Sequence, residues 1–119
     1  MTLLDVVETQ RHKILALERS LAVIEFNLDG IVLRANDAFL KMMNYDRSGL
    51  VGKHHSIFAL PGKQHEEELQ ELWSRLRRGE HTVGEFCRKD RGGQPVWIHG
   101  VYCPLIDEDG TPYRIMKFA

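Results

Sequence analysis

Apolar residues in the first twenty positions recur with the spacing of a helix that has one apolar side. They follow a heptad seam that a single polar residue interrupts, and the seam consists of Leu3, Val7, Gln10, Ile14, Leu17 and Leu21. The pattern predicts an amphipathic helix over residues 2–20. Such a stripe suits a helix that folds over its own sheet, and equally one that pairs two copies of the chain. The apolar seam residues are therefore the candidate interface of a homodimer.

Two apolar runs around an Asp-Gly pair predict a β-hairpin next. Residues 22–27 and 31–35 form its strands, and Gly30 tolerates the positive φ that such a turn needs. Asn36 follows where a helix N-cap belongs, because its side-chain oxygen can accept a backbone N–H. The helical spacing of the next apolar residues predicts a helix to about residue 44.

The middle of the chain is predicted to be helical. Residues 45–52 indicate a turn with a short helix, and residues 54–58 a further helical turn. The longest helix is expected over residues 64–78, with acidic residues in its first turns and basic residues in its last turns, which complements the helix dipole. Gly79 suits its C-terminal end. The apolar stripe of this helix consists of Leu69, Leu72, Trp73 and Leu76.

Alternating patterns after Gly79 predict three more strands, at 82–89, 95–106 and 111–119. Consecutive hairpins give antiparallel neighbours, and the helical middle carries the chain to another edge of the sheet. The expected fold is α+β, a five-stranded antiparallel sheet with helices on one face. Both faces of the 95–106 strand are largely apolar. We therefore expect the second face to be covered as well, by the N-terminal helix or by a partner chain.

Composition indicates a single domain of ordinary charge. The 119 residues include sixteen basic and seventeen acidic ones, which leaves no basic footprint for nucleic acid. No apolar run is long enough for a membrane span, and no signal peptide is present. We therefore expect a cytoplasmic protein. The last strand ends without a turn or cap, so we expect an excised module whose output domain lies elsewhere in a longer protein.

The two cysteines do not have the spacing of a metal site. A hairpin centred on Gly92-Gly93 would place Cys87 opposite Ile98 and Cys103 opposite Thr82. Residues rise by about 3.4 Å along a strand, so the two sulfurs would lie too far apart for a disulfide.

Short motifs in a fixed order over residues 21–119 resemble those of a PAS sensory domain. They are the Asp29-Gly30 hairpin with Ala35-Asn36 and Phe39, Gly52-Lys53-His54-His55, Leu72-Trp73, Leu76-Arg77-Arg78-Gly79-Glu80, Gly84-Glu85-Phe86, Val96-Trp97-Ile98, Tyr102-Cys103-Pro104-Leu105 and Asp109-Gly110. The subtype is similar to that of bacterial methyl-accepting chemotaxis receptors and of some cyclic-dinucleotide signalling proteins. The resemblance implies a sensor of oxygen, redox state or a small ligand that signals through flanking helices to a downstream domain. The alternative is a ligand-free module for dimerisation or protein interaction.

The resemblance also implies a ligand pocket between the helices and the sheet. The candidate lining residues are Phe39, His55, Ile57, Trp73, Ile98, Gly100 and Tyr102. The same residues suit a core without a cavity. A glycine within a strand, such as Gly100, often marks close approach by a ligand or by another backbone.

Haem and flavin (FAD) are the cofactors that the resemblance allows, and a site without a cofactor is an equal alternative. A neutral imidazole can ligate haem iron, and His55 is the first candidate, followed by His54 and His65. Alternatively, His55 is a hydrogen-bonded residue that orders its loop. Flavin-binding aerotaxis receptors carry tryptophan where this chain has Thr82. The reactive cysteine motif of light-sensing PAS proteins has no counterpart after Asn36.

Catalysis has little support in the sequence. No spacing suggests a set of nucleophile, base and orienting acid. The run Glu66-Glu67-Glu68 lies at a helix start, where the helix dipole explains it. We therefore expect a binding or signalling module and not an enzyme.

Overall fold

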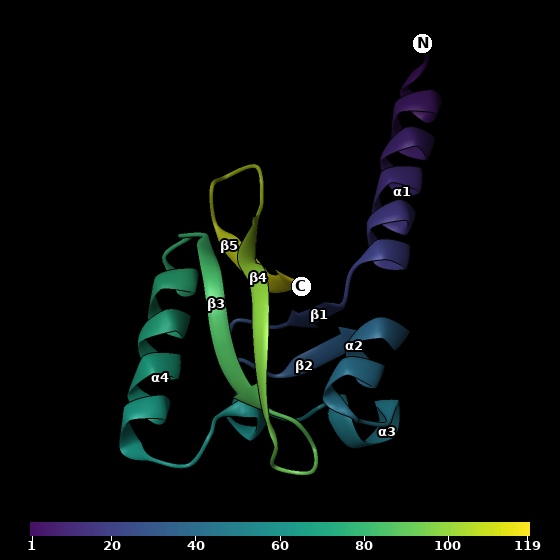
Figure 1. Cartoon of the computed structure of the whole chain (residues 1–119). Coiled ribbons are helices and arrows are strands. Elements are labelled where there is room, and N and C mark those ends of the chain that lie inside the picture. The colour runs from purple at the N-terminus through teal and green to yellow at the C-terminus, as the bar shows by residue number, and fades with distance from the viewer.

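Five strands form one antiparallel sheet in the computed structural model, which describes residues 1–119 (Figure 1). The strand order is β2–β1–β5–β4–β3, so the first hairpin and the last two strands meet at the centre, where β1 pairs with β5. The strands are β1 (Val23–Phe26), β2 (Val32–Ala35), β3 (Thr82–Lys89), β4 (Pro95–Ile106) and β5 (Pro112–Phe118). The predicted five-stranded antiparallel sheet is confirmed.

Helical elements between β2 and β3 carry the chain from one edge of the sheet to the other. They are α2 (Asp37–Met43), α3 (Arg47–Leu50), the 3-10 helix η1 (His55–Phe58) and α4 (Lys63–Arg77). Asn36 caps α2 as predicted, and Asn44 ends that helix in the left-handed conformation. These elements lie over one face of the sheet, which confirms the α+β arrangement (Figure 1).

Side chains fill the space between the helices and the sheet. Trp73 of α4 meets Phe26 of β1 edge to face, with ring centroids 4.9 Å apart. Phe39 of α2 meets Phe58 of η1 in the same way at 5.7 Å. The stripe predicted on α4 is buried in full, because Leu69, Leu72, Trp73 and Leu76 all belong to this core.

The helix α1 (Leu3–Ser20) stands away from the rest of the chain (Figure 1). A capping box between Thr2 and Asp5 fixes its start. None of its residues is buried, and the seam residues Leu3, Val7, Ile14 and Leu17 are exposed, whereas Leu21 just beyond its end is half-buried. The helix does not cover the second face of the sheet, where Val83 and Trp97 are exposed. The expectation that the N-terminal helix covers this face is therefore wrong, and cover by a partner chain stays a prediction. None of the helices combines the length and the apolar character needed to cross a membrane.

The register of the β3–β4 hairpin differs by one residue from the predicted register. Cys87 pairs with Trp97 and Thr82 pairs with Tyr102, because the loop is centred on Gly92. Gly93 takes a positive φ of 82° and its N–H donates to the carbonyl oxygen of Asp90, which closes a three-residue loop. Both cysteines are free thiols.

Candidate functional site

A pocket of about 330 Å³ opens between η1, the first half of α4 and the end of β3. Its wall combines apolar and polar groups, among them His54, His55, Glu66, Leu69, Gln70 and Lys89. This volume is at the small end of the range for ligand pockets, which runs from about 300 to 1,000 Å³. The pocket therefore suits a small molecule with polar groups.

His55 forms part of this wall and also holds the β1–β2 turn in place. Its side chain is 6% exposed and stacks on Trp73 with ring centroids 4.1 Å apart. Its backbone N–H donates to the carbonyl oxygen of Gly30 at 2.8 Å. The ring lies so close to Gly30 that a Cβ atom at that position would meet its Cδ2 atom at 2.0 Å. A residue with a side chain at position 30 would displace the His55 ring.

The environment of His55 keeps its imidazole neutral. Burial lowers the pKa of His55 from 6.5 to about 3, and the charges of His54, Arg77 and Arg88 act in the same direction. Its Nδ1 atom is buried without a hydrogen-bond partner. The loop is therefore ordered by stacking and by the backbone bond, and not by a side-chain hydrogen bond of His55.

These contacts do not fit haem bound through the Nδ1 atom of His55, because that atom is enclosed and has no room for an iron ion. The Cδ2–Nε2 edge of the ring faces Gly30. His54 and His65 are exposed, and the Nδ1 atom of His54 accepts from the backbone N–H of Ser56. A broad planar ring such as a flavin also meets a filled interior between α4 and the sheet.

The seven predicted pocket residues occupy different places in the structure. Only His55 lines the 330 Å³ pocket. Phe39, Trp73, Ile98 and Tyr102 are buried in the core, and Ile57 packs against it. A Cβ atom at Gly100 would lie 2.4 Å from the carbonyl oxygen of Phe118, so the close approach at this glycine comes from the backbone of the next strand.

Lys89, Gln70 and Glu66 also line the pocket, although no motif in the sequence singles them out. Lys89 ends β3, whereas Gln70 and Glu66 lie on polar positions of α4. Polar residues at such positions normally face solvent. Their convergence depends on how α4 lies against β3, and no short motif in the sequence signals it.

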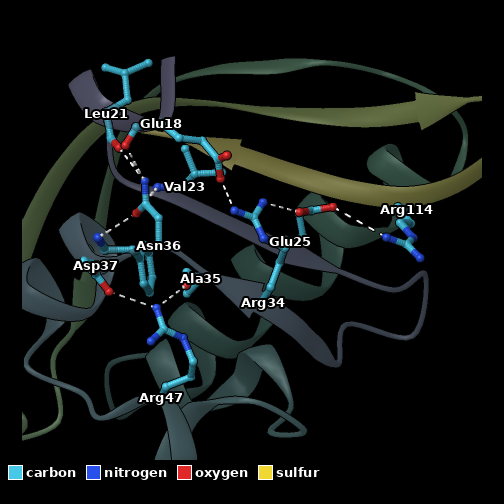
Figure 2. Close-up of polar contacts among 11 residues, drawn as sticks. Glu18, Leu21, Val23, Glu25, Arg34, Ala35, Asn36, Asp37, Arg47 and Arg114 are labelled. Carbon is cyan, nitrogen blue, oxygen red and sulfur yellow. Dashed lines mark hydrogen bonds and ion pairs between the residues drawn. The ribbon is translucent and has the colours of Figure 1, made fainter. Parts of the chain in front are cut away.

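A second set of polar contacts ties the end of α1 to the sheet (Figure 2). The Oδ1 atom of Asn36 accepts from the backbone N–H groups of Val23 and Phe39, each at 3.0 Å. Its Nδ2 atom donates to the carbonyl oxygens of Glu18 at 3.0 Å and Leu21 at 2.8 Å. One side chain thus joins α1, β1 and α2.

Arg34 of β2 extends this junction across the sheet (Figure 2). Its guanidinium pairs with Glu18 of α1 and with Glu25 of β1, and hydrogen bonds to Glu25 and then Glu18 raise its pKa. Glu25 in turn lies 3.7 Å from a guanidinium nitrogen of Arg114 on β5. Charges of alternating sign therefore run from α1 over β2 and β1 to β5.

The sequence model of the PAS fold matches residues 32–119, which is most of the chain. The chain belongs to the PAS-fold family. The match confirms the resemblance that the sequence motifs indicated.

Relatives of this PAS domain include a bacterial protein named for biofilm dispersion. The chain is 46% identical over 120 residues to the biofilm dispersion protein BdlA of Pseudomonas aeruginosa, and covers 98% of its own length but only 29% of that relative. Among solved structures, the PAS domain of a Colwellia psychrerythraea protein has a TM-score of 0.75 at 19% identity, with 95% of each chain covered. The light-state dimer of the fungal blue-light photoreceptor Vivid has a TM-score of 0.70 at 20% identity, with 83% of this chain and 76% of that chain covered. At such identities the two structures show the shared fold alone.

Proposed function

We propose that this PAS domain is the sensory module of a chemoreceptor-like signalling protein, and that it passes a change in its core to α1. The observation that carries the proposal is the junction around Asn36. This residue bonds the last turn of α1 directly to β1 and α2, while the apolar seam of α1 stays exposed. Such a helix suits a homodimer in which it pairs with the same helix of a second copy.

The β1–β2 hairpin supports a mechanical route from the pocket to α1. At its turn, the carbonyl oxygen of Leu28 accepts from Trp73 Nε1 at 3.0 Å and from Arg77 Nε at 2.9 Å. His55 of the pocket wall contacts Gly30 in the same turn. The other end of the hairpin holds α1 through Asn36 and Arg34. A small molecule, oxygen or a redox change that shifts η1 or α4 would therefore move the base of α1.

The relatives support the wider context of this proposal. The chain spans 29% of BdlA, and we propose that it is part of a longer protein in the cytoplasm, which carries a downstream signalling domain. We propose that the module itself is not an enzyme. Dimers occur for a structural neighbour, since Vivid was solved as its light-state dimer.

A ligand-free dimerisation module is the second candidate function. The observation that favours it is the filled interior, where most of the predicted pocket residues serve the core. The two candidates differ in whether a small molecule changes the arrangement of the α1 helices.

Spin labels on α1 test the proposed coupling. In the full chain, with Cys87 and Cys103 replaced by serine and a label at Thr9→Cys, pulsed electron resonance should give one narrow distance between the two copies. The substitution Asn36→Ala should broaden that distribution, because the carbonyl groups of Glu18 and Leu21 lose their partner. Asp37→Ala is the matched control, since Asp37 bonds only the exposed Arg47. Equal distributions in all three proteins would contradict coupling through Asn36.

A further inference from the structure

A group of buried polar side chains on the sheet is not explained by apolar packing. Arg88 of β3, Tyr102 of β4 and Lys117 of β5 lie on three adjacent strands and are 4%, 3% and 3% exposed. An Arg88 guanidinium nitrogen lies 3.4 Å from the hydroxyl oxygen of Tyr102. The Lys117 ammonium lies 4.6 Å from the centroid of the Tyr102 ring. The three residues form one cationic cluster on the core face.

This cluster contains two cations and has a single carboxylate partner. An oxygen of Glu68 on α4 lies 3.3 Å from Arg88 Nη1, whereas Lys117 has no ion pair. Buried charges are normally paired, because removing an ion from water is costly. Burial lowers the pKa of Lys117 and outweighs Tyr102, whose charge and hydrogen bond act to raise it, while the charge of Arg88 lowers it further. Burial alone would raise the pKa of Tyr102, but Lys117 and Arg88 outweigh it and leave that pKa below its usual value. The cluster therefore attracts negative charge.

The one carboxylate that meets the cluster is held loosely. The Glu68 side chain is 48% exposed, and α4 begins at Gly62 without a side-chain cap. Residues 63–68 of the helix are exposed, so its first turns bury no apolar side chain. Little therefore opposes the movement of Glu68 away from Arg88.

A hollow of about 240 Å³ borders Glu68 but not Arg88, so a small molecule in it reaches Arg88 only when Glu68 moves aside. Gln64 and His65 of α4 supply polar groups, and the exposed indole of Trp97 supplies an apolar surface. Glu85 also lines the hollow, and its carboxylate disfavours a second negative charge on a ligand. The lining therefore fits a molecule with one carboxylate and an apolar part.

We propose that Arg88, with Tyr102 and Lys117 behind it, is a carboxylate site that Glu68 fills from within the chain. A small monocarboxylic acid displaces Glu68 and places its apolar part against Trp97. This inference rests on the proposed sensory function and assigns a ligand class to a second hollow, apart from the 330 Å³ pocket. Displacement of Glu68 would release the first half of α4, whose second half holds the β1–β2 turn through Trp73 and Arg77.

Titration calorimetry of the full chain with benzoate tests the site. Glu68→Gln removes the competing carboxylate but keeps its shape, so it should bind benzoate at least about tenfold more tightly than the parent chain, a difference of about 1.4 kcal/mol. Glu67→Gln is the matched control, because Glu67 pairs only with the exposed Lys63 on the same helix face. It should leave the affinity unchanged. Benzyl alcohol should not bind to Glu68→Gln, since it lacks the carboxylate.

Arg88→Met and Lys117→Met in the Glu68→Gln background should each weaken benzoate binding at least tenfold. Their circular dichroism shows whether they fold, and the Glu68→Gln comparison decides the proposal if they do not. Equal affinity of the parent and Glu68→Gln, no binding by either, or equal binding of phosphate would overturn the carboxylate site. The spin-label distances are measured without benzoate, so the proposed role of α1 stands or fails separately.

Discussion

His55 links three parts of the domain through one ring. It forms part of the pocket wall, stacks on Trp73 and leaves no space for a side chain at Gly30. The sequence indicated a pocket-wall histidine, and His55 does line the pocket. Its stacking partner and the contact with Gly30 could not be predicted, because both come from distant segments that meet only when the sheet closes. The neutral ring with its enclosed Nδ1 atom makes this histidine a packing group of the pocket wall.

Acid should destabilise the domain through His55. Its pKa is 6.5 in the unfolded chain and about 3 in the folded one, so below pH 6.5 the unfolded state takes up a proton that the folded state excludes. The contribution of the neutral His55 ring to the free energy of unfolding is therefore complete above pH 6.5 and is lost as the pH falls toward 3. Between pH 7 and 5 the loss should be about 2 kcal/mol, measured by urea unfolding. His55→Phe should flatten this pH dependence.

His81→Gln is the control for this measurement, because His81 is an exposed histidine just before β3. It should keep the pH dependence of the parent chain. A steep dependence that persists in His55→Phe would place its origin in another group.

At the scale of elements, periodicity predicts the helices and strands and fails for the contacts between them. The strands at 82–89 and 95–106 have the predicted bounds, and α4 begins and ends one residue early. The register of the β3–β4 hairpin was wrong by one residue, because Gly92 and Gly93 are equivalent turn residues in sequence but only Gly93 takes a positive φ. The pocket depends on the placement of α4 against β3, and the periodicity of residues along a sequence does not predict how two elements pack together.

Of the residues in α4, Trp73 should contribute most to the free energy of unfolding. Its side chain is buried against Phe26 and His55, and its Nε1–H donates to the carbonyl oxygen of Leu28. Trp73→Ala should lower the free energy of unfolding by about 3–5 kcal/mol. Glu71→Ala, on the exposed side of the same helix, should change it by less than about 0.5 kcal/mol, since it removes only a surface ion pair with Arg75. A melting midpoint unchanged by Trp73→Ala would show that the tryptophan is not part of the core.

At the scale of the whole molecule, the chain leaves two apolar surfaces uncovered. One is the seam of α1, and the other is the sheet face with Val83 and Trp97. The helix could have covered that sheet face in the same chain, but Asn36 and Arg34 hold its last turn so that it points away (Figures 1 and 2). Exposed apolar residues that are grouped on one surface are typical of an interface with another protein.

The seam of α1 should therefore hold two copies together in solution. Ile14→Asp with Leu17→Asp places charges in the middle of the seam and should convert a dimer to a monomer in light scattering at 100 µM chain concentration, about the range in which weak helix pairs associate. Removal of residues 1–20 should have the same effect. Ala16→Asp is the matched control, because Ala16 lies on the same exposed helix outside the seam, and this variant should remain dimeric. If the parent chain is a monomer under these conditions, or if the double variant is still a dimer, α1 is not the interface. A dimer that survives both changes would point to the uncovered sheet face around Trp97, where a Trp97→Asp variant would then separate the copies.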